Sequence, residues 1–411
     1  FTVILCFLSV SVLLLGVVTW HVTNSNAMSV APTMEALDAV TGSVNTFANN
    51  FFKNVAESNS GNLICSPISA SMVLSMAAFG ARGNTEKQLR TALALPSDDT
   101  MTKNGFQSLV DSFKVIVLRL ANKIYLAKGF QVKPEFKGIT ETYFRSEAES
   151  VNFGKPVEAS KTINDWCEAQ TNNRIKDLIK PDDLGGDTAL VLVNAVYFKG
   201  NWADKFNPNE TQPRPFHVDA QTVKDVPTMH RSGKYRYGEL PEYKAKFVEL
   251  PYKDFSDSVS MIVILPDEID GLADLEKNLD KITVNQLLRG STRDVNLYLP
   301  KFKIESSFDL AGPLTKMGLT DMFEDVANFT GITDAPPLKV SKVVQKAFIE
   351  VNEEGSEAAA ATALVAVNYS ARVGTPPPVT FEVDHPFVYL IMRRFTPCII
   401  FQGHCKNLPV E

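Results

Sequence analysis

The chain contains five histidines, the side chain most often used for proton transfer at neutral pH: His21, His217, His230, His385 and His404. None of them stands in the His-Glu-x-x-His spacing of zinc proteases, and the sequence has no Gly-x-Ser-x-Gly elbow, phosphate loop or dinucleotide fingerprint. His385, which precedes Pro386, is interpreted as a strand residue. We therefore expect that the protein is not an enzyme; a catalytic group assembled from distant residues is the alternative.

Thiol chemistry is the second candidate, because the chain has five cysteines: Cys6, Cys65, Cys167, Cys398 and Cys405. No two are spaced as Cys-x-x-Cys, so neither a thioredoxin-like redox site nor a zinc ribbon is indicated. Cys65 and Cys167 lie in apolar patterns typical of buried thiols. Cys398 and Cys405 flank a short apolar strand, where a disulfide and two free thiols are the alternatives. We expect no metal site and no cofactor.

The stretch from Glu353 to Ser370 has an unusual run of small residues. Its alanines favour a helix, but β-branched Val365 and Val367 favour a strand. As a strand, one face would carry only small residues before a leucine: Ser356, Ala358, Ala360, Thr362 and Leu364. Such a face can enter a crowded sheet without a clash, and Gly355 before it accepts most backbone angles. An Ala-rich linker or a short surface helix is the alternative.

Two strands are predicted to position this stretch. Residues Ala189–Phe198 form an apolar run of strand length, which suits a strand covered on both faces. Ala347, Ile349 and Val351 alternate along a second strand that leads into the small residues. The stretch therefore leaves the end of a sheet strand.

Two helices are predicted near the start of the chain. The first is amphipathic, with apolar residues that recur every three or four positions: Val40, Val44, Phe47, Phe51 and Val55. The second spans Ile68–Phe79 and is apolar or small all round, as expected of a buried helix. Ser66 is predicted to cap it, Pro67 suits its first turn, and Gly80 and Gly83 end it.

Length and composition are those of a globular protein with a large core: 411 residues, 45% hydrophobic and 21% charged. No linker or internal repeat divides the chain, which favours one α+β domain. The net charge of −6 and the absence of a dense Lys/Arg run argue against nucleic acid as a partner.

The first residues resemble a targeting segment. Residues 1–20 hold no charged side chain, and a polar patch with small Ser25 and Ala27 follows. We predict a secretory signal over residues 1–27, truncated at its N-terminus, then a flexible segment over residues 28–37. A signal-anchor helix is the alternative, because about 20 apolar residues span a bilayer. We expect a secreted, extracellular protein with no membrane association after signal removal.

Three Asn-x-Ser/Thr sequons occur, at Asn209, Asn328 and Asn368. A secreted chain would expose them to glycosylation, and we expect glycans at Asn209 and Asn328. The occupancy of Asn368 stays open at this point.

Motifs along the chain resemble the serpin family in sequence and in order: Asn62–Ser69 with Gly80–Thr85, Ile163–Cys167 with Ile175–Ile179, Leu192–Trp202, Val259–Pro266 and His385–Val388. The resemblance implies a single α+β serpin domain over residues 38–409. It further implies a large central, mostly antiparallel sheet, two further sheets, eight to nine helices and an exposed reactive-centre loop over residues 353–380.

The resemblance also implies a function, the irreversible suicide-substrate inhibition of serine proteases. A protease cuts the exposed loop, forms an acyl-enzyme, and is trapped as the loop inserts into the main sheet. The hinge that enters the sheet would consist of Glu353, Glu354, Gly355, Ser356, Glu357, Ala358, Ala359, Ala360, Ala361 and Thr362. Its small residues favour inhibition; a non-inhibitory serpin that acts as a binding or carrier protein is the alternative.

The bond that serves as bait follows from the family spacing of about fourteen residues past the hinge glycine. That spacing gives Tyr369–Ser370 and a chymotrypsin-like target; the alternative is Arg372–Val373 and a trypsin-like target. We expect a monomer. The loop and signal look arthropod-like, which implies clotting, melanisation or other innate-immunity proteases as targets, or a secretion such as venom or saliva.

A sheet-opening cluster is the last expectation from the resemblance. Many members carry a histidine where this chain has Gln345, bonded to the serine and asparagine that hold the sheet closed. Ser66, Ser69 and Asn194 match the rest of that cluster, and Trp202 matches the family tryptophan. A glutamine amide both donates and accepts hydrogen bonds, so the contact can persist.

Overall fold

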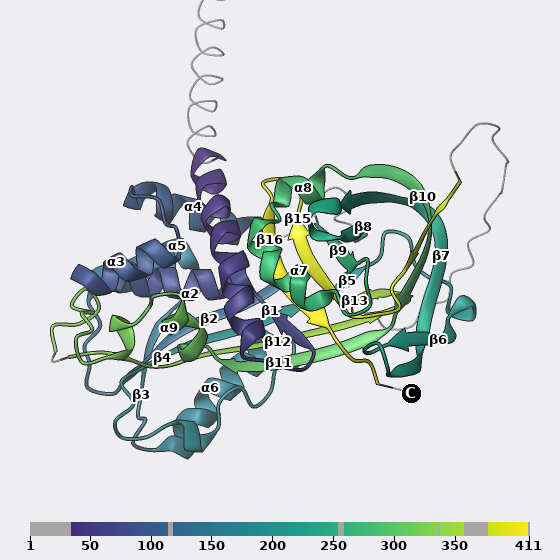
Figure 1. The fold of residues 1–411 in the computed structure, drawn as a ribbon. Helices are drawn as coiled ribbons and strands as arrows, with labels where there is room; N and C mark the ends of the chain where they lie inside the picture. The colour runs from purple at the N-terminus through teal and green to yellow at the C-terminus, as the bar shows by residue number, and fades with distance from the viewer. Residues whose placement is uncertain (1–33, 114–117, 254–258, 336, 357–376, 410–411) are drawn as a thin grey trace, which may run out of the picture.

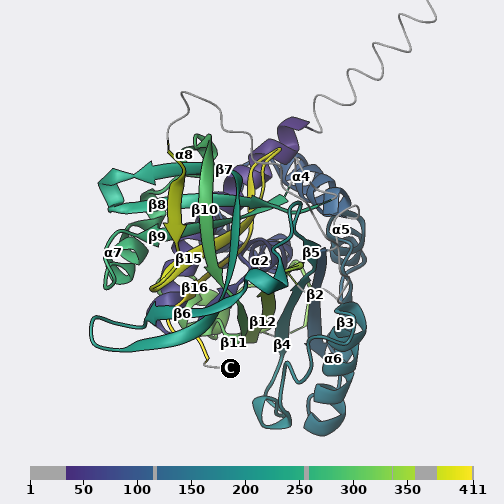
Figure 2. The same ribbon diagram turned by 90° about the vertical axis from the view of Figure 1, so that its right-hand side faces the viewer.

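The computed structural model describes residues 34–113, 118–253, 259–335, 337–356 and 377–409. A seven-stranded sheet runs through the molecule, with helices on both of its faces and a nine-stranded sheet beside it (Figures 1 and 2). Within these ranges, no helix is both long and apolar enough to cross a membrane.

The seven-stranded sheet contains the start of the small-residue stretch, Gly355–Ser356. Its strands in order are β3 (Ala148–Val151), β2 (Leu118–Ala127), β4 (Leu190–Phe198), β12 (Val340–Asn352), β13 (Gly355–Ser356) and β5 (Gly200–Asn201), with β11 (Phe302–Asp309) on the far side of β12. β2 runs antiparallel to β4, whereas β4 and β12 are parallel neighbours. The two strands predicted from the apolar patterns are therefore adjacent.

Every residue of β4 is buried, as the apolar run predicts. Leu190, Leu192 and Val196 face the main core, which includes α2 (Pro67–Gly80). Val191 and Val193 face a second, smaller core under α6 (Pro156–Gln170). The strand is thus covered on both faces, and burial of each such side chain contributes about 1.5–3 kcal/mol.

The remaining strands of the predicted fold are hydrogen-bonded into a nine-stranded sheet. Its strands in order are β1 (Leu63–Cys65), β16 (Cys398–Cys405), β15 (Phe387–Arg393), β9 (Val259–Pro266), β8 (Ala245–Pro251), β7 (Val223–Leu240), β10 (Ser291–Pro300) and β14 (Val379–Glu382), with β6 (Gln212–His217) on β7. β7 has 18 residues and pairs in turn with β6, β10 and β8. Because one long strand joins the parts, they form a single hydrogen-bonded sheet.

The helices lie mostly on one side of the seven-stranded sheet (Figure 1). Besides a helix over residues 34–57 and the two helices above, they are α3 (Gly83–Ala92), α4 (Asp99–Ser112), α5 (Pro134–Phe144), α7 (Leu272–Asn278), α8 (Val284–Leu288) and α9 (Ala311–Lys316). Short 3-10 turns are η2 (Pro181–Asp183), η3 (Pro208–Glu210), η4 (Pro241–Tyr243), η5 (Leu279–Lys281) and η6 (Asp321–Phe323). Residues 34–37 are already helical, with Ala36 and Leu37 buried, so they are not part of a flexible segment as expected.

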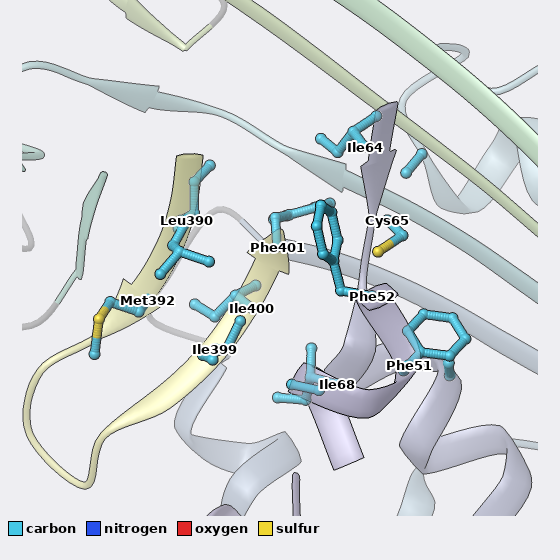
Figure 3. Close-up of a cluster of buried hydrophobic side chains, with 14 of the residues drawn as sticks. Phe51, Phe52, Ile64, Cys65, Ile68, Leu390, Met392, Ile399, Ile400 and Phe401 are labelled. Atoms are coloured by element: carbon cyan, nitrogen blue, oxygen red, sulfur yellow. The ribbon is translucent and has the colours of Figure 1, made fainter. Parts of the chain in front are cut away.

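The helix α2 is buried over its whole length, as its uniform apolar composition predicts. Figure 3 shows Ile68 at its start near Phe51 and Phe52 of the helix over residues 34–57 and near Ile400 of β16. Ser66 occupies the cap position, but its side chain does not cap the helix. Its hydroxyl donates to the Ile400 carbonyl at 2.8 Å instead, which ties the helix start to β16.

A disulfide between Cys398 and Cys405 is excluded. The two residues lie at opposite ends of β16, roughly 23 Å apart at the rise of an extended strand, whereas bridged Cα atoms lie within about 7 Å. Both are buried free thiols, as are Cys65 and Cys167. His385 lies in a bend before β15 rather than in a strand, and its ring nitrogens contact Asp384 Oδ1 at 2.7 Å and the Pro266 carbonyl at 2.8 Å.

These thiols are expected to make the fold sensitive to alkaline pH. Burial raises the pKa of Cys167 and of Cys398 to about 12, whereas an unfolded thiol titrates near 8.5, at about its model-peptide pKa. Above about pH 8.5, the unfolded chain loses thiol protons that the folded protein keeps. The free energy of unfolding therefore falls by up to about 1.4 kcal/mol per thiol and pH unit. Urea unfolding of wild type and Cys167→Ala from pH 8 to 10 measures this effect.

The difference in unfolding free energy between the two proteins should shrink as the pH rises, because the variant has lost one such thiol. In the folded protein at pH 8, peptide mapping should find these four cysteines unmodified by iodoacetamide. A pH-independent difference, or rapid alkylation of the folded protein, would contradict the expectation.

Candidate functional site

The small-residue stretch begins inside the seven-stranded sheet rather than outside it. The strand β13 runs antiparallel to β12 on one side, with Ser356 opposite Val351. On the other side it runs antiparallel to β5, with Ser356 opposite Gly200. Because β5 begins two residues after β4 ends, β13 lies between β12 and the continuation of β4. Just beyond the paired length of β4 and β12, an added strand therefore already lies in the sheet.

This position corrects the expected boundaries of the exposed loop. Gly355 and Ser356 are buried, and β14 begins at Val379 inside the predicted range of 353–380. The remaining predicted loop residues lie outside the described residues: Glu357, Ala358, Ala359, Ala360, Ala361, Thr362, Asn368, Tyr369, Ser370, Arg372 and Val373.

Gly355 is required by space as well as by backbone angle. Its φ is +149°, a backbone angle that residues other than glycine rarely adopt. A Cβ atom built there would lie 2.1 Å from the Gly200 carbonyl oxygen and 2.6 Å from the Asn201 Cα. The close approach of β13 to β5 therefore depends on a residue without a side chain.

The turn before β13 is fixed to the segment that follows β5. The Glu354 carbonyl accepts from the Trp202 amide at 2.9 Å, and the Glu353 carbonyl accepts from the Phe206 amide at 3.0 Å. The Glu353 carboxylate lies 3.3 Å from Lys301 Nζ, and Glu354 forms an ion pair with Lys205. Both carboxylates are mostly buried, so these pairs are stronger than those at an open surface. These contacts attach Glu353 and Glu354 to the body of the protein.

The side chain of Ser356 is anchored by a buried tyrosine. Tyr252 OH and Ser356 Oγ lie 2.7 Å apart, and neither residue has exposed surface. Burial raises the pKa of Tyr252, so its hydroxyl stays protonated and can donate. The Tyr252 ring stacks on Trp202, with centroids 4.7 Å apart, and Trp202 Nε1 donates to the Asn352 carbonyl at 2.9 Å. Trp202 therefore belongs to the hinge, not to the sheet-opening cluster in which it was predicted.

The other four members of that cluster do lie together, and their contacts cross between strands. Gln345 on β12 donates through Nε2 to Asn194 Oδ1 on β4 at 2.6 Å. Its Oε1 accepts from the Ser66 amide at 2.9 Å. Asn194 in turn donates to Ser69 Oγ at 2.6 Å. All four residues are fully buried, so the glutamine forms the contact expected at the histidine position of the family.

The segment between α6 and β4 also contacts β12, through two lysines of that strand. Lys346 of β12 donates to the Lys176 carbonyl at 2.7 Å, in the segment between α6 and β4. Lys342 of β12 lies 2.6 Å from Asp183 of η2 in the same segment. Asn164 of α6 binds the Ile179 backbone in both directions, which holds the segment on the helix. The helix and its following segment thus close over the two strands.

Two site residues were missed in the sequence. Asn122 on β2 completes the cluster, because its Oδ1 accepts from both Ser69 and Asn194. The signal that could have indicated it is alternation, because Asn122 is the polar residue among the otherwise apolar alternate positions Leu118, Leu120, Ile124 and Leu126. Tyr252 gave no such signal, since an aromatic residue after a strand is equally typical of a core.

The two described sequons differ in exposure. Asn209 lies exposed on η3, and the hydroxyl of its sequon residue Thr211 donates to Glu353 Oε1 at 2.8 Å. Asn328 is partly buried, and its Oδ1 accepts from the Thr330 hydroxyl at 2.8 Å. The described part of the chain contains no group of three or more His, Cys, Asp or Glu side chains placed to hold a metal ion.

Comparison with known proteins defines the class of this fold and site. A family model described as Serpin (serine protease inhibitor) matches residues 42–408. The chain belongs to the serpin family, whose members are largely protease inhibitors rather than enzymes. The predicted family and α+β fold are confirmed.

Several relatives match over nearly their full length. Iris of Ixodes ricinus is 39% identical, over 87% of this chain and 95% of that protein. Antichymotrypsin-2 of Bombyx mori is 39% identical, over 84% and 92%. The structure of Serpin48 from the insect Tenebrio molitor aligns with a TM-score of 0.83 at 33% identity, over 90% of this chain and 98% of that one. Uncleaved ovalbumin aligns with a TM-score of 0.78 at 30% identity, over 90% and 100%.

Replacement of Gln345 by alanine is expected to destabilise the protein strongly. The change leaves the Ser66 backbone and Asn194 Oδ1 without their buried partner, and each such loss costs about 1–3 kcal/mol. We expect a loss of about 3 kcal/mol in the free energy of unfolding, measured in urea. Glu350→Ala, at a partly exposed position of the same strand, is the control and should change the free energy of unfolding by less than about 0.5 kcal/mol. Equal effects of the two changes would argue against the cluster as a stabilising link.

Proposed function

We propose that the protein is a secreted, monomeric, irreversible inhibitor of serine proteases that acts as a suicide substrate. The observation that supports this most directly is the place of β13 between β12 and the continuation of β4. A chain that continues from Ser356 in the same direction would pass between β4 and β12 and separate the two strands. Once cut, the loop would insert there as a full strand.

The register of β13 gives the path of that strand. The antiparallel pairing that places Ser356 opposite Val351 would place Thr362 opposite Gln345 and Val367 opposite Val340, where β12 begins. The inserted strand would therefore separate Gln345 from Asn194 and end just before Tyr369. A protease bound covalently to Tyr369 would be carried the length of the sheet.

The energy of this step is sufficient to trap the protease. Insertion adds a strand with roughly ten new backbone hydrogen bonds at a net 0.5–1.5 kcal/mol each, on the order of 10 kcal/mol. Strain released by insertion of a loop is a recognised type of conformational switch. The small residues predicted on one face share the alternation of buried Ser356, so they would face the core.

The bait bond is proposed as Tyr369–Ser370, with Arg372–Val373 as the second choice. A tyrosine fits the apolar pocket of a chymotrypsin-like protease, and an arginine fits the acidic pocket of a trypsin-like one. Relatives of similar identity carry both names, Antichymotrypsin-2 and Antitrypsin of Bombyx mori. The register supports Tyr369, because it lies nearest to the end of the inserted strand.

Export and modification complete the proposal. Residues 1–27 would serve as a signal and be removed, and Asn209 and Asn328 would carry glycans in the extracellular protein. Asn209 is exposed whereas Asn328 is partly buried, which supports a glycan at Asn209 more strongly than one at Asn328. A non-inhibitory carrier role is less well supported, because the residues of the inserting face are all small up to Thr362.

Incubation with chymotrypsin and with trypsin tests the function. We expect an SDS-resistant band with chymotrypsin, at the summed mass less that of the released C-terminal fragment, lost in Tyr369→Ala and retained in Arg372→Ala. Mass spectrometry of the released C-terminal fragment identifies the cut bond. A band with trypsin alone would move the bait to Arg372, and no band with either protease would count against inhibition.

Arginine substitutions on the two faces of the hinge test the insertion step. Ala360→Arg would place a charge on the buried face that Ser356 defines, so this variant should be cleaved as a substrate and form little complex. Ala359→Arg is the matched control on the opposite face and should still inhibit. Cleavage should raise the melting temperature of wild type but not of Ala360→Arg. Equal behaviour of the two variants would contradict insertion in this register.

A further inference from the structure

We propose that His385 and His404 each carry a proton on both ring nitrogens in the folded protein, and that they form a pH-dependent attachment of the C-terminal strands. Both histidines are buried, and neither belongs to the hinge or to the cluster at Gln345. Such an attachment would exist whether or not the protein inhibits a protease.

His404 lies in β16 between two hydrogen-bond acceptors. Its Nδ1 contacts Glu276 Oε1 of α7, and its Nε2 lies 2.8 Å from the Gly61 carbonyl oxygen, in the segment before β1. The residue has no exposed surface. Lys406 approaches the same carboxylate, with Nζ 3.8 Å from Glu276 Oε2. Phe52 packs edge-on against the imidazole, with centroids 5.8 Å apart, and the neighbours of His404 on β1 and β15 are apolar.

His385, in the bend between β14 and β15, repeats this arrangement. Its Nδ1 lies 2.7 Å from Asp384 Oδ1, and its Nε2 lies 2.8 Å from the Pro266 carbonyl oxygen at the end of β9. Burial opposes the ionisation of Asp384, but the hydrogen bond and charge of His385, with His217 nearby, hold the pKa of that carboxyl below its usual value. The carboxyl group is therefore ionised at neutral pH, and the proton between the two side chains lies on the ring.

The number of acceptors around each ring favours the charged form. A neutral imidazole has a proton on one nitrogen and can donate only one hydrogen bond. With an acceptor at each nitrogen, a neutral ring would leave one buried acceptor opposite a lone pair, which is unfavourable. The doubly protonated ring satisfies both acceptors and places its positive charge beside a carboxylate.

These hydrogen bonds attach the C-terminal strands to separate parts of the fold. His385 joins the start of β15 to the end of β9, and His404 joins β16 to α7 and to the segment before β1. An unfolded histidine loses its charge near about pH 6.5. Above that pH the unfolded chain binds fewer protons than the folded protein, so the stability from these bonds falls as the pH rises.

Selective labelling of histidine with nitrogen-15 detects the ring protons directly in the full-length protein. At neutral pH, NMR spectra should show both ring nitrogens of His385 and of His404 as protonated. Loss of one set of signals in His385→Arg and of the other in His404→Arg assigns them. A neutral ring at either position would overturn the proposal for that histidine.

Urea unfolding from pH 5.5 to 7.5 tests the attachment, in a range below that in which the buried thiols titrate. The unfolding equilibrium constant of wild type should rise between pH 6.5 and 7.5 by up to about tenfold for each histidine. Arginine is a permanent cation with several donors. His385→Arg and His404→Arg should therefore each remove part of this pH dependence, and the double variant should remove most of it.

His230→Gln is the matched control. His230 is partly exposed, and one of its ring nitrogens lies 3.0 Å from Glu210 Oε2. This change should reduce the pH dependence less than either arginine variant does. A pH dependence that persists in the double variant, or that falls equally in His230→Gln, would overturn the attachment.

Discussion

The parallel contact between β4 and β12 is the constraint on which the structure depends. The two strands must be joined firmly enough to give a folded protein and, in the proposed mechanism, must still separate to admit another strand. The sheet meets both demands through discrete contacts that cross from strand to strand, above all the hydrogen bond of Gln345 to Asn194. Specific contacts of this kind can be exchanged for others, whereas a continuous apolar contact would have to be exposed to water.

The elements around β4 and β12 make further contacts that hold these two strands in place. The core under α6 is small, and the segment after that helix is held over β12 by Lys346 and Lys342 at its outer face. At the far end, backbone hydrogen bonds attach the turn at Glu353–Glu354 to the segment that follows β5. The fold thus places these contacts beside the point where β13 lies between β12 and β5.

Much of this architecture could be predicted from local patterns. Apolar patterns in the sequence predict the buried strand β4, the buried helix α2 and the strand that leads into the small residues. They do so because the position of each apolar residue marks which side of an element is buried. Predictions that depended on a partner far along the chain were less successful. The hydroxyl of Ser66 binds β16 instead of capping α2, and Trp202 joins the hinge instead of the cluster at Gln345.

The sequence by itself determined the family, the fold class and the residue types of the hinge. Each of these depends on contiguous motifs or on the alternation of apolar and polar residues, which can be recognised without the fold. Only the tertiary structure decided that β13 already lies between β12 and β5, that Asn122 completes the buried cluster, and that Tyr252 holds Ser356. These contacts join residues from about 70 to more than 100 positions apart. No local pattern encodes such a distance, since it is set by the packing of whole strands against one another.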